Sequence, residues 1–496
     1  MNDKVAINLL NTGVPGLDQI LGGGLPEFSF NLIMGPPGSG KTTLAHHIMF
    51  ALATPERPAL FFTTLGEPPL KMLRYQQQFS FFDFDKVNGS IRFVNLSEDV
   101  ATANYDQVLA RITQEVESFS PALVIIDSFR SAVLETSRQS RGALRLQQFI
   151  QQLGVLLSGW LTTAFLVGEF LSSSDPNPVL TVADGLLSLD QKVYRNSMVR
   201  QLQVLKMRGQ DTRPGMHTFR ITSAGIEIFA AAVVRVDAGE ATRADIALKS
   251  EVRLTMGVPR LDEMLGGGLP SGYSLLVAGP SGSGKTILAT AFLAEGVRCG
   301  EPGIIVAFEQ TPSQSWVRTL DDLVRSGKIG LINTRTLDLS MDEIVQHLIH
   351  LIHKMKATRV VIDSLSGFEL AVAPAFREDF RESLFRMITV LSGLGVTVLL
   401  TSELEDRYID LRFSPYGSAF LTDAIIVQRY IEVESRLKRV MAVVKVRASV
   451  HSTEIRQFEI TDEGVVIGDP VLAYEGLLAG RPTRTPAPET SERGKS

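Results

Sequence analysis

The sequence predicts an α/β fold in which two copies of one domain follow each other, each with a mainly parallel sheet and an antiparallel C-terminal extension. Three observations support this prediction. A stretch of thirty residues occurs twice, each copy contains the same glycine-rich motif, and short apolar strands alternate with helical stretches. At 496 residues the chain is too long for one ordinary core, and 44% hydrophobic with 21% charged residues is typical of globular domains.

The repeat is the strongest of these observations. The segment GVPGLDQILGGGLPEFSFNLIMGPPGSGKT begins at Gly13 and returns 244 positions later, at Gly257, as GVPRLDEMLGGGLPSGYSLLVAGPSGSGKT. Further along, LVIIDS ends at Ser128 and VVIDS ends at Ser364. The ungapped match indicates an internal duplication.

The repeat also sets the expected domain boundaries. We expect an N-terminal domain over residues 1–238 and a C-terminal domain over residues 248–470. Residues 471–496 end in GRPTRTPAPETSERGKS, which is rich in proline, hydroxyl-bearing and charged residues and has no apolar period. We therefore expect a flexible tail there.

Within the first copy, the strand–helix alternation can be followed element by element. The expected elements are a strand over 30–35, a helix over 42–53, a strand over 59–64, a helix near 107–118, a strand over 122–127, a helix near 142–157 and a strand over 164–168. Such alternation is typical of a parallel sheet covered on both faces. HTFRITSAGIEIF and IRQFEITDEGVVI, near the ends of the two copies, predict antiparallel strands joined by tight turns.

Composition excludes several classes of protein. A net charge of −5 argues against a basic nucleic-acid surface, and a single cysteine, Cys299, excludes an intramolecular disulfide framework. The N-terminal MNDKVAINLL lacks the features of a signal peptide, so we expect a cytoplasmic protein with no membrane partner. The most apolar run, Leu153 to Leu171, is interrupted by polar residues and predicts a helix end followed by a buried strand.

GPPGSGKT (Gly35–Thr42) and GPSGSGKT (Gly279–Thr286) both match the phosphate-loop pattern G-x-x-x-x-G-K-[ST] between a strand and a helix. Glycines let the backbone N–H groups wrap phosphates, lysine reaches the β- and γ-phosphates, and the threonine hydroxyl binds Mg²⁺. We therefore expect ATP and Mg²⁺ at both loops. The expected nucleotide-binding residues are Gly35, Pro36, Pro37, Gly38, Ser39, Gly40, Lys41, Thr42 and Thr43 in the first copy and Gly279, Pro280, Ser281, Gly282, Ser283, Gly284, Lys285, Thr286 and Ile287 in the second.

Two aspartates complete the expected metal sites. Asp127 and Asp363 each end an apolar strand, where a carboxylate can orient the shell of the Mg²⁺ bound by Thr42 or Thr286. The alternative is that each aspartate caps the following turn. Hydrolysis also needs a base for the attacking water, and the segments FFTTLGEPP and IVAFEQTP offer Glu67 and Glu309.

The duplicated domain, the GGGLP lead-in, the phosphate loops, the IDS strands and a K-x-R pair in each copy resemble the KaiC family of RecA-like ATPases over about residues 5–485. The resemblance implies two tandem RecA-like P-loop NTPase domains that assemble as a homohexameric double ring. In that family the strand after the loop helix ends in two adjacent glutamates, the first being the water-activating base. Here the pairs read Gly66-Glu67 and Glu309-Gln310, which implies that Glu309 keeps the base role and that Glu67 is a poor substitute.

The K-x-R pairs are Lys206 with Arg208 and Lys445 with Arg447. Residues two apart on a strand project from the same face, so both charges can converge on one phosphate. The resemblance implies that each pair contacts the nucleotide of the neighbouring subunit and stabilises its transition state. The alternative is a solvated cationic strand face.

Some members of the family phosphorylate themselves on an adjacent serine and threonine. The matching segment here, YGSAFLTDAII, has Ala419 and Phe420 at those positions, and neither accepts phosphate. Ser418 and Thr422 lie one place to either side and are equally well explained as capping or turn residues. Any Ser/Thr autokinase activity is therefore expected to be weak.

Together these features predict an ATP-hydrolysing, hexameric conformational switch that recruits a protein signalling partner. The main alternative is a DNA-dependent RecA-like motor or recombinase, which the acidic balance and the lack of a recognisable DNA-binding module disfavour. A third alternative is a nearly inactive scaffold in which ATP only holds subunits together.

Overall fold

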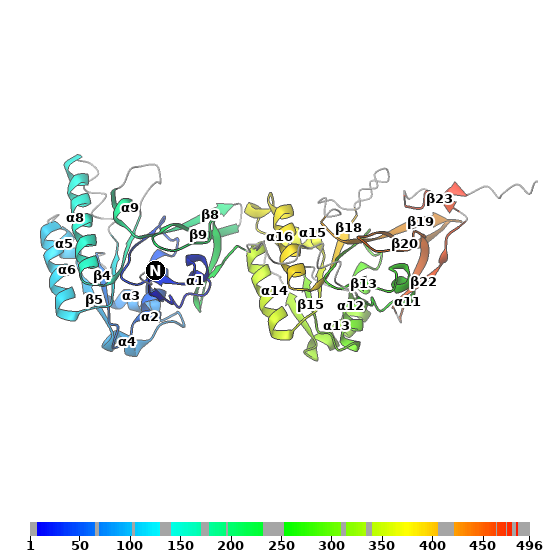
Figure 1. Cartoon of the computed structure of the whole chain (residues 1–496), viewed down its shortest axis with the longest axis horizontal. Coiled ribbons are helices and arrows are strands. Elements are labelled where there is room, and N and C mark those ends of the chain that lie inside the picture. The colour runs from blue at the N-terminus through cyan, green and yellow to red at the C-terminus, as the bar shows by residue number, and fades with distance from the viewer. Residues whose placement is uncertain are drawn as a thin grey trace, which may run out of the picture. The chain divides into compact units, whose positions relative to one another are not determined.

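The computed structural model describes residues 7–64, 69–101, 105–128, 140–169, 178–194, 197–231, 252–308, 314–333, 340–404, 421–462, 464–472, 474–478 and 483–484. The chain divides into two compact units between Ala231 and Ala232 (Figure 1).

The first unit consists of β1 (Leu9–Leu10), α1 (Leu17–Leu21), β2 (Leu25–Pro26), β3 (Phe30–Met34), α2 (Lys41–Leu52), β4 (Ala59–Thr63), α3 (Pro69–Gln76), α4 (Phe84–Gly89), β5 (Ile91–Asn95), α5 (Ser97–Ala101), α6 (Tyr105–Phe119), β6 (Leu123–Asp127), α8 (Ser140–Gly159), β7 (Thr163–Gly168), α9 (Pro178–Val182), β8 (Gly185–Tyr194), β9 (Ser197–Met207), β10 (His217–Thr222) and β11 (Gly225–Phe229).

The second unit consists of β12 (Arg253–Leu254), α11 (Pro259–Met264), β13 (Leu269–Pro270), β14 (Ser274–Gly279), α12 (Lys285–Arg298), β15 (Gly303–Ala307), α13 (Gln314–Arg325), β16 (Ile329–Asn333), α14 (Met341–Met355), β17 (Arg359–Asp363), α15 (Leu365–Ala371), the 3₁₀ turn η1 (Pro374–Phe376), α16 (Phe380–Gly393), β18 (Thr397–Glu403), β19 (Ala424–Val433), β20 (Arg436–Val446), β21 (Arg456–Thr461), β22 (Gly464–Pro470), β23 (Tyr474–Glu475) and β24 (Thr483–Arg484).

Both units contain a nine-stranded sheet with the same strand order. The order is β11-β10-β9-β8-β3-β7-β6-β4-β5 in the first unit and β22-β21-β20-β19-β14-β18-β17-β15-β16 in the second. In the first unit the strands from β8 to β5 are parallel, and β9, β10 and β11 extend the sheet, each antiparallel to the strand before it. The predicted α/β fold with a mainly parallel sheet and an antiparallel extension is therefore confirmed in both copies.

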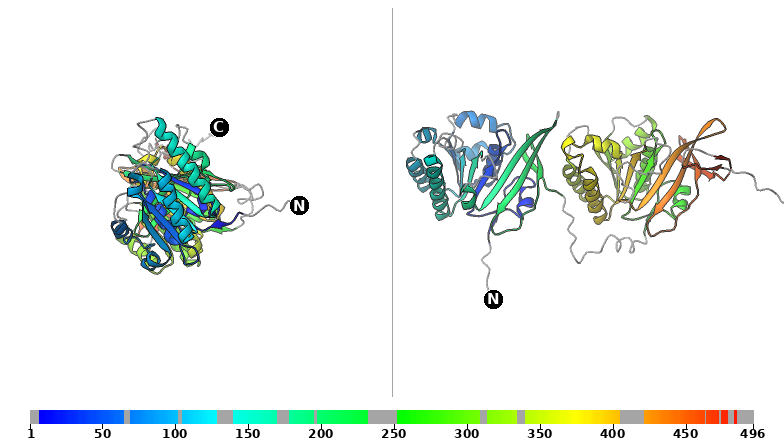
Figure 2. Two further views of the ribbon diagram at one scale, coloured as in Figure 1. Left: turned by 90° about the vertical axis from the view of Figure 1, so that its left-hand side faces the viewer. Right: turned by 90° about the horizontal axis from the view of Figure 1, so that it is seen from above.

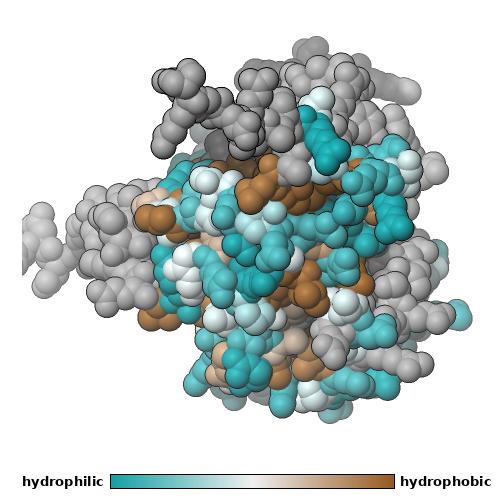
Figure 3. Space-filling view, turned by 90° about the vertical axis from the view of Figure 1, so that its right-hand side faces the viewer, coloured by the Kyte–Doolittle hydropathy of each residue, from teal (hydrophilic) through white to brown (hydrophobic). Residues whose placement is uncertain are grey.

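Helices cover both faces of each sheet, which explains why the parallel strands are almost wholly apolar. All five residues of β3 are buried, for example. In the first unit α1 and α2 pack on one face and α6 and α8 on the other (Figure 2). In the second unit α11 and α12 face α14, α15 and α16 across the sheet. At the antiparallel end of the second unit, hydrophobic and hydrophilic residues are mixed over the surface (Figure 3).

The apolar run from Leu153 divides as predicted, because α8 ends at Gly159 and the buried strand β7 begins at Thr163. Among the described residues, no helix combines the length and the apolar character that a membrane span requires. The sequence patterns missed β5 and the short helices α3 and α4. In β5 only Ile91 and Val94 are buried, so five residues give too short a pattern to recognise.

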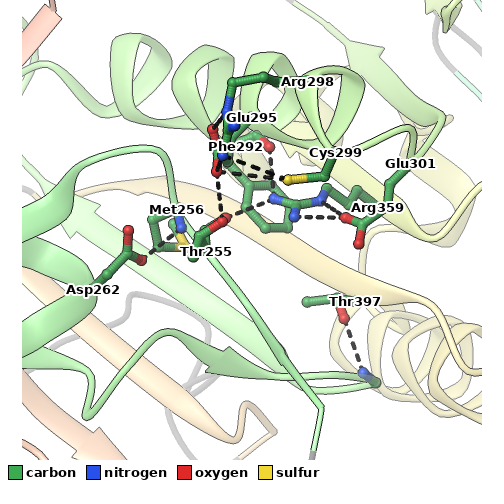
Figure 4. Close-up of polar contacts among 11 residues, drawn as sticks. Thr255, Met256, Asp262, Phe292, Glu295, Arg298, Cys299, Glu301, Arg359 and Thr397 are labelled. Atoms are coloured by element: carbon green, nitrogen blue, oxygen red, sulfur yellow. Dashed lines mark hydrogen bonds and ion pairs between the residues drawn. The ribbon is translucent and has the colours of Figure 1, made fainter.

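A buried arginine distinguishes the second unit from the first. Arg359 begins β17 with its side chain 1% exposed, and its guanidinium lies 2.6 Å from the Glu301 carboxylate. It also donates to the backbone carbonyls of Thr255 and Phe292 and lies over the Phe292 ring (Figure 4). The equivalent residue of the first unit, 236 positions earlier, is Leu123. Arg359 thus ties the first residues of the second unit to its sheet and to α12.

Candidate nucleotide sites

Each phosphate loop lies at the carboxyl edge of the parallel strands. The loop Gly35–Gly40 connects β3 to α2, and β3 lies between β7 and β8. The loop Gly279–Gly284 connects β14 to α12, and β14 lies between β18 and β19 in the same way. Ligands of open α/β sheets bind outside the carboxyl ends of the strands where the strand order reverses, which is the position of both loops.

The glycines of the two loops adopt matching conformations. Gly38 and Gly40 have φ angles of 76° and 98°, and Gly282 and Gly284 have 75° and 101°. These values lie in the left-handed region, which side chains other than glycine rarely adopt. A Cβ atom on Gly35 would lie 2.2 Å from the Leu189 carbonyl oxygen, so glycine is also required there by space. The loops therefore have the shape that lets backbone N–H groups surround a phosphate.

Each loop lysine is hydrogen-bonded to the backbone of its own loop. Lys41 Nζ donates to the carbonyl oxygens of Gly35 and Pro36, at 2.8 Å each. Lys285 Nζ makes the equivalent bonds to Gly279 at 2.9 Å and Pro280 at 2.8 Å. Each lysine is the first residue of its helix, so each ammonium group lies where the helix N-terminus already favours an anion.

The predicted metal-binding residues of the first copy lie together. Thr42 Oγ1 donates to Asp127 Oδ2 at 2.6 Å, and Asp127 is buried at the end of β6. Burial raises the pKa of the Asp127 carboxyl, whereas the Thr42 hydrogen bond and the charge of Lys41 lower it. A hydroxyl and a carboxylate side by side are oxygen ligands of the kind that Mg²⁺ accepts, so these residues fit that ion.

In the second copy the aspartate has a different neighbour. Asp363 accepts a hydrogen bond from Thr401 Oγ1, which belongs to the adjacent strand β18. The equivalent residue of β7 is Val167, which has no hydroxyl. In both copies the peptide bond after the aspartate is cis. The Asp363 carboxylate is thus hydrogen-bonded to a residue of the neighbouring strand, whereas the Asp127 carboxylate is hydrogen-bonded to a residue of the loop helix.

The first K-x-R pair lies at the amino ends of the parallel strands, and its charges contact the C-terminal end of α9 and the two residues that follow it. Lys206 Nζ donates to the carbonyl oxygens of Ala183 at 2.6 Å and Thr181 at 3.2 Å. Arg208 forms an ion pair with Asp184 at 3.1 Å and also donates to Thr181. Burial and the neighbouring Arg208 lower the pKa of Lys206, and Asp184 raises it.

The second pair repeats this arrangement. Lys445 Nζ donates to the Thr422 carbonyl at 2.7 Å, and Arg447 lies 3.3 Å from Asp423. Each strand ends between its lysine and its arginine, because β9 stops at Met207 and β20 at Val446.

A register shift precedes the lysine in both hairpins. It lies between Leu186 and Leu187 in β8, and between Ile425 and Ile426 in β19. Such bulges redirect the side chains that follow them.

Several predicted residues lie outside the described residues. They are Glu67, Glu309, Ser418, Ala419 and Phe420. Thr422 is described: it is fully buried, and its hydroxyl has no hydrogen-bond partner in the described part of the chain.

The sequence patterns missed the residues that orient the predicted ones. Asp184 and Asp423 each form an ion pair with an arginine. Each also accepts a hydrogen bond from the backbone N–H of the first residue of the strand that precedes the phosphate loop, which is Phe30 or Ser274. The two aspartates lie 239 positions apart, the same offset as the two K-x-R pairs. The repeat therefore contained the information needed to find them.

The fold and the two loops define a tandem P-loop NTPase. The family model of the KaiC ATPase matches residues 10–233 and 254–471, and the chain belongs to the KaiC ATPase family with two RecA-like domains. The chain is 26% identical over 506 residues to the "Circadian clock oscillator protein KaiC" of Rippkaea orientalis, covering 99% of this chain and 94% of that protein. It is 28% identical over 498 residues to the "Circadian clock protein KaiC3" of Synechocystis, covering 97% and 95% of the two chains.

Proposed function

We propose that the chain binds ATP and Mg²⁺ at both phosphate loops, hydrolyses ATP mainly in its second half, and uses the nucleotide to assemble into a hexameric cytoplasmic switch. The observation that carries this proposal is the separation of the K-x-R pair from the phosphate loop within one domain.

The separation follows from the strand register. The start of the first loop lies against Leu189 of β8, and Arg208 pairs with Asp184, five residues earlier along the chain. Five residues of a strand span about 17 Å. An arginine side chain cannot cover that distance along the sheet, so Arg208 can reach a nucleotide only on another copy of the domain. The same count separates Gln428, beside the second loop, from Asp423.

The residues at each site have separate tasks in this proposal. Lys41 and Lys285 would exchange the loop carbonyls for the β- and γ-phosphates. Thr42 with Asp127, and Thr286 with Asp363, would hold Mg²⁺, which neutralises phosphate charge when bound. Arg208, 59% exposed, would exchange Asp184 for the phosphate of a neighbouring copy. Glu309 would take the proton of the attacking water, and Glu67 would contribute little because Gly66 replaces the first glutamate of the family's pair.

The relatives named as circadian clock proteins support a regulatory role, in which the assembled state recruits a protein partner. Residual Ser/Thr self-phosphorylation would be weak, since the acceptor positions hold Ala419 and Phe420.

Light scattering with and without ATP and Mg²⁺ tests the proposal. We expect about six protomers with ATP and fewer without it. Arg208→Ala should weaken assembly. Arg260→Ala serves as the control, because Arg260, which is 47% exposed, also forms an ion pair with an aspartate, Asp469, at 3.2 Å and has no proposed role. A strict monomer with ATP at micromolar concentration would contradict the proposal, and turnover strongly stimulated by single-stranded DNA would favour a motor instead.

A further inference from the structure

The second phosphate loop is attached to the neighbouring strand by a side chain that the first loop lacks. Ser283 Oγ donates to Gln428 Oε1 at 2.9 Å. Gln428 lies in β19, directly after Val427, which pairs with Ala278 of the loop strand. Its side chain is fully buried at 0% exposure, and Ser283 is buried as well.

The packing around this hydrogen bond is close. A Cβ atom added to Gly279 would lie 2.8 Å from Ser283 Oγ and 2.9 Å from Gln428 Cβ. The first glycine of the loop, its inner serine and the glutamine are thus in mutual contact. A movement of Ser283 away from its present position would break the hydrogen bond and open this contact.

The first loop has no such connection. Its inner serine, Ser39, is equally buried, but its hydroxyl has no hydrogen-bond partner within the described ranges. The residue equivalent to Gln428, 239 positions earlier, is Leu189. The second and third glycines of the two loops have matching φ angles, whereas the hydrogen bond from the inner serine is present in the second loop alone among the described residues.

Stability does not explain the glutamine. Gln428 Nε2 is buried and has no hydrogen-bond partner among the described residues, and such a group destabilises a fold. Leucine at the equivalent position shows that the fold accepts an apolar side chain there. The amide thus leaves one of its own groups unpaired, and its one side-chain hydrogen bond among the described residues is to Ser283, which points to a role at the loop.

We infer that Gln428 is a positioning residue that fixes the second phosphate loop in its phosphate-binding shape, so that the second site binds nucleoside di- and triphosphates more tightly than the first. A loop that is already ordered loses less conformational entropy when its N–H groups bind phosphate. This inference rests on the proposed nucleotide binding at the second loop.

Equilibrium titration of the full chain with the fluorescent nucleotide mant-ADP and Mg²⁺ tests it without any need for turnover. Lys41→Ala silences the first site, so that the second site is measured. In that background Gln428→Leu should raise the dissociation constant about fivefold, the equivalent of one ordinary hydrogen bond. Gln428→Met, which keeps the length of the side chain without the amide, should do the same. In a Lys285→Ala background, Leu189→Gln should lower the dissociation constant of the first site.

Thermal unfolding separates positioning from support of the fold. We expect the melting temperatures of the Gln428 variants to stay close to that of their parent, because removal of the unpaired buried amide nitrogen offsets the loss of the hydrogen bond from Ser283. Unchanged dissociation constants, or weaker binding that accompanies a lower melting temperature in both variants, would overturn the inference alone. Failure of the Lys41→Ala parent to bind mant-ADP would overturn it together with the proposed function.

Discussion

Replacement of Arg359 by leucine, the residue at the equivalent position of the first unit, should destabilise the second unit selectively. Removing one partner of a buried ion pair typically costs about 3–5 kcal/mol. The orphaned carboxylate of Glu301 is 29% exposed and can be hydrated, so we expect the lower end of that range, about 3 kcal/mol. The Thr255 carbonyl also loses its donor.

A second substitution should reverse most of this loss. A Cβ atom on Gly296 would lie 2.6 Å from Arg359 Cδ, so Gly296 leaves room for the arginine. The first unit has Leu52 and Leu123 at these two positions; Leu123 is buried in an apolar cluster, and the partly buried Leu52 packs against the same cluster. Gly296→Leu should therefore damage the parent but stabilise the Arg359→Leu variant. Helix propensity contributes about 1 kcal/mol and burial of leucine about 1.5–3 kcal/mol to that stabilisation.

Urea unfolding can follow the second unit alone. The chain has two tryptophans, Trp160 and Trp316, and in a Trp160→Phe background the fluorescence reports on Trp316 in α13. A loss of about 3 kcal/mol shifts the midpoint by roughly 1 M urea at an ordinary slope. If the double variant unfolds at a lower urea concentration than Arg359→Leu, the two positions do not compensate each other and the reasoning is wrong.

Three further predictions concern chemistry and pH. Glu309→Gln should remove most steady-state ATPase activity, by about 10²–10⁴, whereas Glu67→Gln should remove little; the reverse result would assign turnover to the first half. Mass spectrometry after incubation with ATP should find little phosphate on Ser418 or Thr422, and stoichiometric phosphate on either would identify a kinase. Burial raises the pKa of the Asp262 carboxyl to about 6, although the hydrogen bond from the Met256 N–H lowers it. The folded state therefore binds this proton more tightly than the unfolded chain does. The free energy of unfolding should decrease as the pH rises from about 4 to about 6. Asp262→Asn keeps the acceptor for Met256 and should melt with the parent at pH 4 but above it at pH 7; parallel melting curves at both pH values would exclude this titration.

The sequence predicted the parts of the molecule that depend on local pattern. The phosphate loops can be predicted because Gly40, Lys41 and Thr42 belong to one motif of consecutive residues. The buried strands can be predicted because an apolar run is recognisable in the sequence even when the neighbouring strands are not known. The repeat then extended each observation to the other copy. Asp127 lies at the end of its strand, as the pattern predicts, and accepts a hydrogen bond from Thr42, whereas the binding of Mg²⁺ by these two residues stays a prediction.

The remaining features depend on pairing between distant segments. The patterns did not reveal that β3 lies between β7 and β8, although this order decides which residues surround the loop. The contacts of Lys206 with the carbonyls after α9 follow from the bulge in the β8–β9 hairpin, which no local pattern encodes. The role of Gln428 could not be predicted for a different reason: a single polar residue in an apolar strand matches no known sequence motif.

The phosphate loop and the K-x-R pair lie at opposite ends of the parallel strands of one sheet. This separation also limits the assemblies that the domain can form. A contact that joins two different ends is head-to-tail, and two copies joined in this way still present one unused loop and one unused arginine. If each site is completed by a neighbouring copy, as proposed, a symmetric dimer would leave sites incomplete, and only a closed ring or an open filament would complete all of them. Because one polypeptide carries both domains, such an assembly would contain the two domains in equal numbers.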